Sequence, residues 1–133
     1  MGSVVADTHS IVWYLHDDSK LSAKAVSAMD SALGGSDPIF VASISLVELT
    51  YLVEKRRLPD SALKMLRVAL TGSSFGFRLA PLDLLVADTL PQVRRDEVPD
   101  PPDRVIAATA LALKLPLVTC DGRIRASGIQ TIW

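Results

Sequence analysis

The chain has 133 residues, of which 49% are apolar and 22% are charged, a composition that excludes a disordered or fibrous protein. Its length predicts one domain spanning residues 1–133. A single cysteine excludes a disulfide framework, and with only two histidines it also argues against a zinc site. The net charge of −1 argues against a protein that coats nucleic acid, and 5% aromatic residues argue against one that stacks rows of bases.

The sequence carries no recognisable export or membrane signal. No apolar run approaches the ~18 residues needed to span a membrane. The residues before Asp7 lack the basic start of a signal peptide. Together with the single cysteine, these features predict a cytoplasmic protein without a membrane partner.

Short apolar runs alternate with amphipathic segments along the whole chain. In chain order the predicted elements are a strand at 4–6, helices at 11–16 and 22–33, a strand at 39–41, helices at 45–56 and 61–70, a weak strand at 77–82, a helix at 84–93, a helix that starts within 100–103 and runs to 113, a strand at 117–119, a short helical turn, and a strand at 129–133. This alternation predicts parallel βαβ units, with an α/β sandwich around a sheet buried on both faces.

Four acidic residues stand where predicted strands end or predicted helices begin: Asp7, Glu48, Asp103 and Asp121. In parallel α/β folds, ligands gather beyond the carboxyl ends of the strands. Two carboxylates ~4 Å apart repel by roughly 4 kcal/mol, and a divalent cation removes that cost. Oxygen ligands favour Mg²⁺ or Mn²⁺, which can activate a water and stabilise charge on a phosphate. The predicted substrate is therefore a phosphodiester.

Each of these acids also has a purely structural interpretation. Asp7 suits the cap of the following helix, and the segment from Ser45 to Glu48 matches a capping box. Asp103 suits the first turn of a helix, and Asp121 suits a turn before glycine.

Basic residues are clustered rather than evenly spread, at 55–57, at 94–95, and at Arg123 and Arg125. Without the four acids above, the 14 basic residues outnumber the remaining acidic ones. A basic surface around an acidic cleft is typical of a nuclease, although solvated surface charge explains each cluster equally well.

Four segments in sequence order resemble the motifs of PIN-domain proteins of the VapC toxin type. They are DTHSIVW at 7–13, SLVEL at 45–49, DPPDRVIAATA at 100–110 and LVTCDGRI at 117–124. The resemblance implies a three-layer α/β/α sandwich with a parallel central sheet, and an endoribonuclease that depends on Mg²⁺ or Mn²⁺. It also implies a toxin that a cognate small antitoxin holds inactive and that commonly forms a homodimer.

By motif position, the resemblance assigns the acidic cluster to Asp7, Glu48, Asp103 and Asp121. Asp7 and Asp103 are the expected metal ligands, while Glu48 and Asp121 complete the shell, often through water. Together they would hold a metal ion that activates water for attack on an RNA phosphodiester.

Further residues near these motifs are candidates for supporting roles, each with an alternative. Thr119 either orients a carboxylate or metal-bound water or simply ends its strand. His9 either contacts substrate or packs, and Arg104 either faces RNA phosphate or pairs with an acid. Asp100 either approaches the cleft or caps its helix, and Cys120 is expected to be buried packing.

Three functions follow from the resemblance. A toxin ribonuclease is the first, and a neighbouring reading frame for a small antitoxin would favour it. A housekeeping PIN nuclease for RNA maturation is the second, and a non-catalytic PIN-like binding module is the third. A phosphoacceptor receiver domain is set aside, because no lysine follows the strand at 117–119.

Overall fold

The computed structural model describes residues 2–72 and 76–133. Its centre is a five-stranded sheet with the order β3-β2-β1-β4-β5, in which every neighbouring pair is parallel. The strands are β1 (Val4–Ala6), β2 (Ile39–Ala42), β3 (Phe77–Ala80), β4 (Leu117–Val118) and β5 (Thr131–Ile132). The predicted α/β class with a parallel sheet is confirmed.

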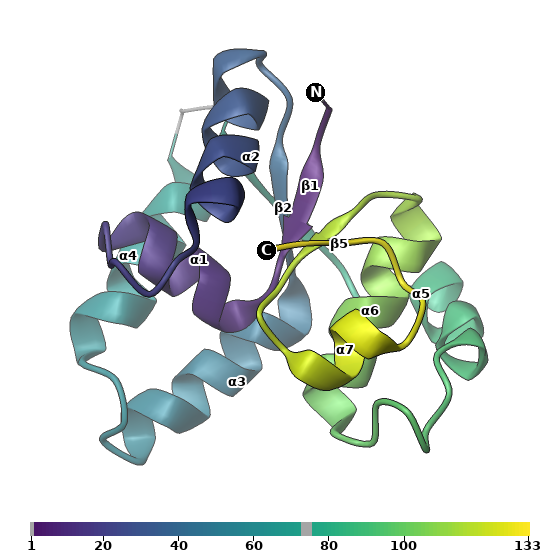
Figure 1. Ribbon diagram of the computed structural model, residues 1–133. Helices are drawn as coiled ribbons and strands as arrows, with labels where there is room; N and C mark the ends of the chain where they lie inside the picture. The colour runs from purple at the N-terminus through teal and green to yellow at the C-terminus, as the bar shows by residue number, and fades with distance from the viewer. Residues whose placement is uncertain (1, 73–75) are drawn as a thin grey trace.

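Helices cover both faces of this sheet (Figure 1). They are α1 (Thr8–Leu15), α2 (Ala23–Gly34), α3 (Ser43–Glu54), α4 (Asp60–Thr71), α5 (Leu84–Thr89), α6 (Pro101–Leu113) and α7 (Gly122–Ala126), with a 3₁₀ turn at Leu90–Gln92. Helices α1 to α4 contribute to one core, and α5 to α7 contribute to the other. The arrangement is the expected three-layer α/β/α sandwich.

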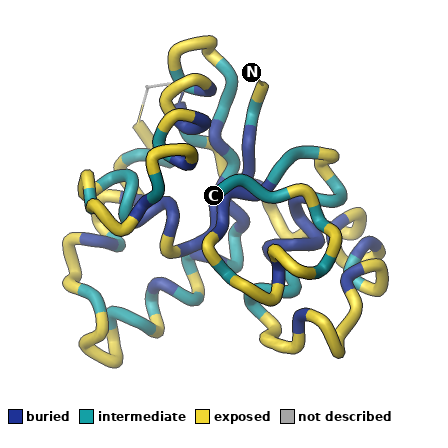
Figure 2. Tube along the Cα trace, viewed as in Figure 1, coloured by how far each residue is buried: buried dark blue, intermediate teal, exposed yellow. Residues whose placement is uncertain are grey.

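The two cores follow from the apolar character of both faces of the central strand. In β1, Val4 and Ala6 point into the first core, and Val5 points into the second. All three residues are at most 1% exposed, as expected for a parallel strand buried on both sides. Figure 2 shows this dark-blue interior between exposed outer turns of the helices.

Several predicted boundaries shift for identifiable reasons. Helix α1 begins at Thr8 instead of residue 11, because Asp7 caps it directly. Helix α3 begins at Ser43, two residues before the predicted start. The predicted helix at 84–93 is divided, since α5 ends at Thr89 and Pro91, which lacks a backbone N–H, sits in the 3₁₀ turn.

Within the described ranges, no helix combines the length and apolar character needed to cross a membrane.

Candidate active site

Asp7 lies at the carboxyl end of β1 and opens α1. Its Oδ1 accepts the backbone N–H of Ser10 at 2.9 Å, which is an N-cap hydrogen bond. The residue is only 9% exposed. The structural interpretation of Asp7 as a cap is therefore confirmed, and its second carboxylate oxygen is left for other contacts.

Glu48 lies on α3, and its side chain is held from α1. The Thr8 hydroxyl donates to Glu48 Oε1 at 2.6 Å and also lies 2.9 Å from the hydroxyl of Ser45. The capping box predicted for Ser45 and Glu48 does not form, because α3 already begins at Ser43 without a side-chain cap. Ser45 is instead fully buried beneath Thr8.

Asp100 and Asp103 belong to the start of α6. Asp100 is the N-cap residue, and its Oδ2 accepts the backbone N–H of Asp103 at 3.1 Å. The prolines at 101 and 102 occupy the first turn, where a missing N–H leaves no helical hydrogen bond unmade. Helix capping thus brings the two carboxylates onto the same end of the helix.

Asp121 follows β4 and caps the short helix α7. Its Oδ1 accepts the backbone N–H of Ile124 at 2.9 Å, and its own backbone N–H donates to the Thr119 hydroxyl at 3.0 Å. Thr119 is fully buried. Its hydroxyl therefore positions the backbone of Asp121.

These acids meet in one pocket of about 210 Å³ at the carboxyl edge of the sheet. Its lining residues are Asp7, His9, Glu48, Asp100, Asp103, Cys120 and Asp121. Carboxylate oxygens of Glu48, Asp100 and Asp103 lie within 4.8 Å of one another. Asp7, which the sequence pairs with Asp103 as a metal ligand, lines the same pocket outside this closest group. Asp100 thus both caps its helix and belongs to the cluster.

The crowding of carboxylates has an electrostatic consequence at Asp103. Partial burial, followed by the charges of Asp100, Asp121, Glu48 and Asp7, raises the pKa of Asp103 from 3.8 to about 7. Burial and like charge both disfavour the ionised form. Near neutral pH Asp103 therefore exchanges between its protonated and ionised forms, and a bound cation would favour the ionised form.

The donor set fits a hard divalent ion. Every carboxylate of the cluster offers oxygen, the ligand atom that Mg²⁺ and Mn²⁺ prefer. Glu48, Asp100 and Asp103 already place their oxygens close enough to share one ion, and an ion there relieves the repulsion that raises the pKa of Asp103.

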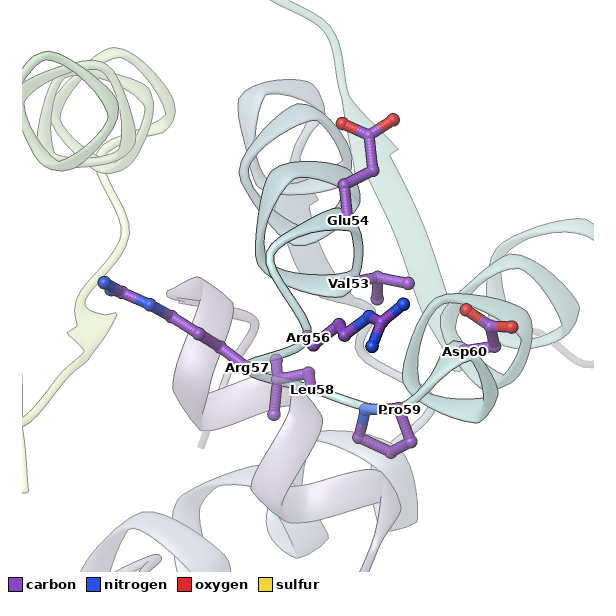
Figure 3. A pocket seen from close by; sticks show the side chains of 7 residues that line it. All are labelled: Val53, Glu54, Arg56, Arg57, Leu58, Pro59 and Asp60. Atoms are coloured by element: carbon purple, nitrogen blue, oxygen red, sulfur yellow. The ribbon is translucent and has the colours of Figure 1, made fainter.

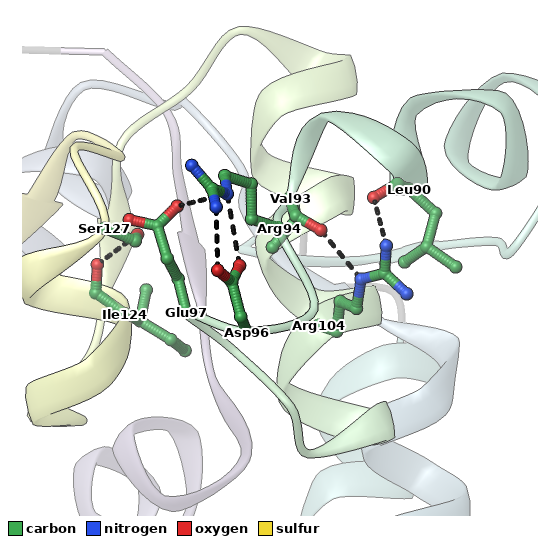
Figure 4. A network of polar contacts seen from close by, with 8 residues as sticks. All are labelled: Leu90, Val93, Arg94, Asp96, Glu97, Arg104, Ile124 and Ser127. Carbon is green, nitrogen blue, oxygen red and sulfur yellow. Dashed lines mark hydrogen bonds and ion pairs between the residues drawn. The ribbon is translucent and has the colours of Figure 1, made fainter.

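Arg104 lies outside the pocket lining, although it follows Asp103 directly. Its guanidinium donates to the backbone carbonyls of Val93, at 2.8 Å, and Leu90, at 3.3 Å (Figure 4). Of the two roles considered for Arg104, pairing with an acid is therefore not seen among the described residues: the side chain fastens the 3₁₀ turn to α6.

Arg94, from one of the predicted basic clusters, is also engaged with neighbouring residues. It forms an ion pair of 2.7 Å with Asp96 and a longer one of 3.9 Å with Glu97 (Figure 4). Arg94 is thus already paired with two acidic neighbours at the surface.

Two further residues line the pocket. The expectation that Cys120 is buried packing is wrong: the thiol is exposed, at the pocket wall. His9 is exposed, and its ring packs against Trp13 with centroids 5.5 Å apart. Trp13 in turn packs against Trp133 at 6.0 Å.

The main feature that the sequence analysis missed is the Thr8 hydroxyl. It belongs to the first resembling motif, directly after Asp7, and it carries the hydrogen bond to Glu48. Because 40 residues separate the two partners, no local pattern could pair them.

Comparison with known proteins places this geometry in a family. The family model of the PIN domain matches residues 4–128. Ribonuclease VapC22 of Mycobacterium tuberculosis is 32% identical over 126 residues, which cover 95% of this chain and 92% of that protein. The fold is similar to VapBC2 from Rickettsia felis, solved bound to a promoter DNA fragment, with a TM-score of 0.70 and 18% identity over 97% of this chain and 96% of that one. It is also similar to DNA-bound VapBC from Salmonella typhimurium, with a TM-score of 0.69 and 22% identity over 98% and 97%. The chain therefore belongs to the PIN-domain family.

Proposed function

We propose that this chain is an endoribonuclease of the VapC type, a single nuclease domain over residues 1–133 that depends on Mg²⁺ or Mn²⁺ and hydrolyses RNA phosphodiesters in the cytoplasm. The observation that carries the proposal is the cluster of Glu48, Asp100 and Asp103, with their oxygens within 4.8 Å, in the pocket that Asp7 and Asp121 also line. The similarity to a protein named as a ribonuclease over nearly the whole chain supports the same activity.

The residues divide the work by how close their oxygens lie. Glu48, Asp100 and Asp103 would hold the ion, because their carboxylate oxygens lie within 4.8 Å of one another, and Asp7 and Asp121, which line the same pocket, would hold water beside it. A divalent ion bound there supplies positive charge that stabilises a phosphate under attack and lowers the pKa of water. The capping bonds keep the carboxylates from turning away, so their orientation is set before substrate binds.

The complexes in which similar proteins were solved favour a toxin over a housekeeping nuclease for RNA maturation. The Rickettsia felis and Salmonella typhimurium structures are VapBC assemblies. We propose that a small antitoxin also holds this chain inactive. A pocket lined by five carboxylates suits an inhibitor that inserts an arginine or lysine. A binding module without catalysis is disfavoured, because each predicted acid lines the pocket.

We further propose a homodimer formed through the start of α5. Leu82, Leu84 and Leu85 are 50%, 76% and 58% exposed. Contiguous exposed apolar side chains are a feature of protein interaction surfaces. Leu84→Glu is expected to shift the protein from dimer to monomer in light scattering, whereas Val68→Glu, at an exposed site on α4, leaves the mass unchanged.

Cleavage of a mixed cellular RNA pool tests the function. Purified protein free of antitoxin is incubated with Mg²⁺ or Mn²⁺, beside an EDTA control and the variant Asp103→Asn. We expect cleavage only by the wild type with metal. Asp88→Asn, at an exposed acid on α5, serves as the matched control and is expected to cleave normally. Equal cleavage by Asp103→Asn and wild type would contradict the proposed site.

A further inference from the structure

A groove continues the acidic pocket along the outer face of α3. It has a volume of about 460 Å³ and shares Glu48 and Asp100 with the pocket. Among its other lining residues are Val47, Tyr51, Lys55 and Arg57. The groove therefore leads from the carboxylates to basic residues at the end of the helix.

A second hollow adjoins this groove at the turn between α3 and α4. It is lined by Arg56 and Arg57, so that Arg57 borders both hollows (Figure 3). Shared lining residues thus connect three hollows in a row, from the acidic pocket to the basic turn.

The cations of this path are not neutralised by neighbours. Among the described residues, neither Lys55 nor Arg57 forms an ion pair within 4.0 Å. Figure 3 shows the Arg57 side chain extended away from the carboxylates of Glu54 and Asp60. Arg94, by contrast, has two acidic partners. Lys55 and Arg57 are therefore available to an anionic ligand.

The backbone of the turn fixes the points at which the side chains of residues 55–57 leave the chain. The N–H of Arg56 bonds the carbonyl of Val53 at 3.0 Å, and the N–H of Arg57 bonds that of Leu52 at 2.9 Å. Arg56 adopts a left-handed φ of 59°. This is a Schellman end, which terminates the helix in a defined geometry.

Tyr51 adds an exposed aromatic ring between the two ends. It is 58% exposed and lies one helical turn before Lys55, on the same face of α3. Seven residues of helix place Lys55 about 10 Å along the axis from Glu48. A cation at that distance reaches a neighbouring phosphate rather than the one at the carboxylates.

We propose that this groove binds the RNA strand beside the cleaved phosphodiester, with Lys55 and Arg57 contacting phosphates and Tyr51 stacking on a base. The inference rests on the proposed ribonuclease function and names the path of its substrate. Single strands are bound in this way wherever cations follow the backbone and aromatic rings take the bases. A second copy of the chain fits the groove less well. It would bury Lys55 and Arg57, which form no ion pair with the described residues of this chain, and burying an unpaired charge is costly.

The test compares the double variant Lys55→Gln/Arg57→Gln with Lys24→Gln/Arg67→Gln, which removes the same charge from exposed sites on α2 and α4. Cleavage of a mixed-sequence single-stranded RNA is measured with Mg²⁺, and binding of the same RNA is measured in EDTA over a range of salt concentrations. For two lost phosphate contacts, we expect binding about 20-fold weaker at 0.1 M salt and a salt slope lower by about 1.4. KM rises while kcat stays within about twofold, because the lost contacts bind the strand outside the reacting group.

Tyr51 is tested separately. Tyr51→Leu is expected to weaken binding about tenfold, and Tyr51→Phe is expected to bind normally, because the ring alone is needed for stacking. Light scattering on both variants monitors self-association.

The outcomes separate the alternatives. The groove is not an RNA site if the two double variants lose RNA binding equally. A change of oligomeric state in Tyr51→Leu would also overturn the proposal and would assign the groove to another copy of the chain. If wild type binds RNA with the expected salt dependence yet cleaves nothing, the proposed function fails while the groove stands.

Discussion

The hydroxyl of Thr8 donates a hydrogen bond of 2.6 Å to Glu48, joining the first turn of α1 to α3 beneath the acidic pocket. A carboxylate can only accept, so the single hydroxyl proton of Thr8 is donated to Glu48. The Ser45 hydroxyl, whose oxygen lies 2.9 Å from that of Thr8, therefore donates to the Thr8 oxygen. Two helices that are distant in sequence thus orient one carboxylate.

Removing this hydroxyl is expected to weaken metal binding. Thr8→Val keeps the shape of the side chain but leaves Glu48 without its donor. Loss of a group that orients a ligand typically costs 10- to 100-fold in metal affinity or activity, and we expect about that effect on the Mg²⁺ concentration needed for half-maximal cleavage. Thr8→Ser retains the hydroxyl and should behave as wild type. An unchanged Mg²⁺ requirement in Thr8→Val would show that Glu48 needs no positioning.

Asp103 is expected to make the metal-free protein less stable as the pH rises. Its pKa is raised from 3.8 to about 7 in the folded state, so the folded chain binds a proton that the unfolded chain releases. The stabilisation that this proton gives the folded state is fully present below about pH 4 and is lost as the pH rises to about 7. Because solvent screens this partly exposed group, we expect wild type to lose about 1–2 kcal/mol more than Asp103→Asn across this window.

Denaturant titrations in EDTA at a series of pH values measure this difference. Asp88→Asn provides the control for removing one acidic charge from the surface. The explanation fails if the free energies of unfolding of wild type and Asp103→Asn run parallel between pH 4 and pH 7.

Arg104 is expected to contribute to the stability of the fold and not to RNA binding. Its guanidinium holds the carbonyls of Val93 and Leu90, so Arg104→Met should lower the free energy of unfolding by about 1–2 kcal/mol. The KM for RNA should stay within about twofold of wild type at a temperature where both are folded. A large rise in KM without loss of stability would instead indicate a phosphate contact.

Lys114 closes α6 in the left-handed region, with φ of 58°. Its helix end repeats the pattern of the α3 turn, with the N–H of Leu115 bonded to the carbonyl of Ala110 at 3.0 Å. A residue with a Cβ costs roughly 1–2 kcal/mol in this conformation, and glycine avoids that cost. Lys114→Gly should therefore raise the melting temperature, whereas Lys24→Gly, inside α2, should lower it.

The alternation of apolar runs was sufficient to predict the sheet, because Val4–Ala6 and Leu117–Val118 are buried on both faces and show no polar interruption. Boundaries were harder to predict. Asp7 was recognised as a possible helix cap, but the apolar periodicity placed the start of the helix at residue 11, whereas α1 begins directly after Asp7 at Thr8.

The sequence indicated which acidic residues to consider for the pocket, but not which of their carboxylates lie closest together. Each acid stands at a helix start or within a helix after a strand, which a sequence shows. The close approach of Asp100 to Glu48 depends on how α6 meets α3, which is a matter of packing between distant segments. The same limitation hid the role of Arg104 and the exposure of Cys120.

The aromatic row of His9, Trp13 and Trp133 gives the molecule a built-in optical reporter. Both tryptophans of the chain lie in this row, and its outer ring, His9, lines the acidic pocket. A change in charge there alters the electrostatic field on the indoles, so titration with divalent ions or RNA should be visible in their ultraviolet emission without any attached dye.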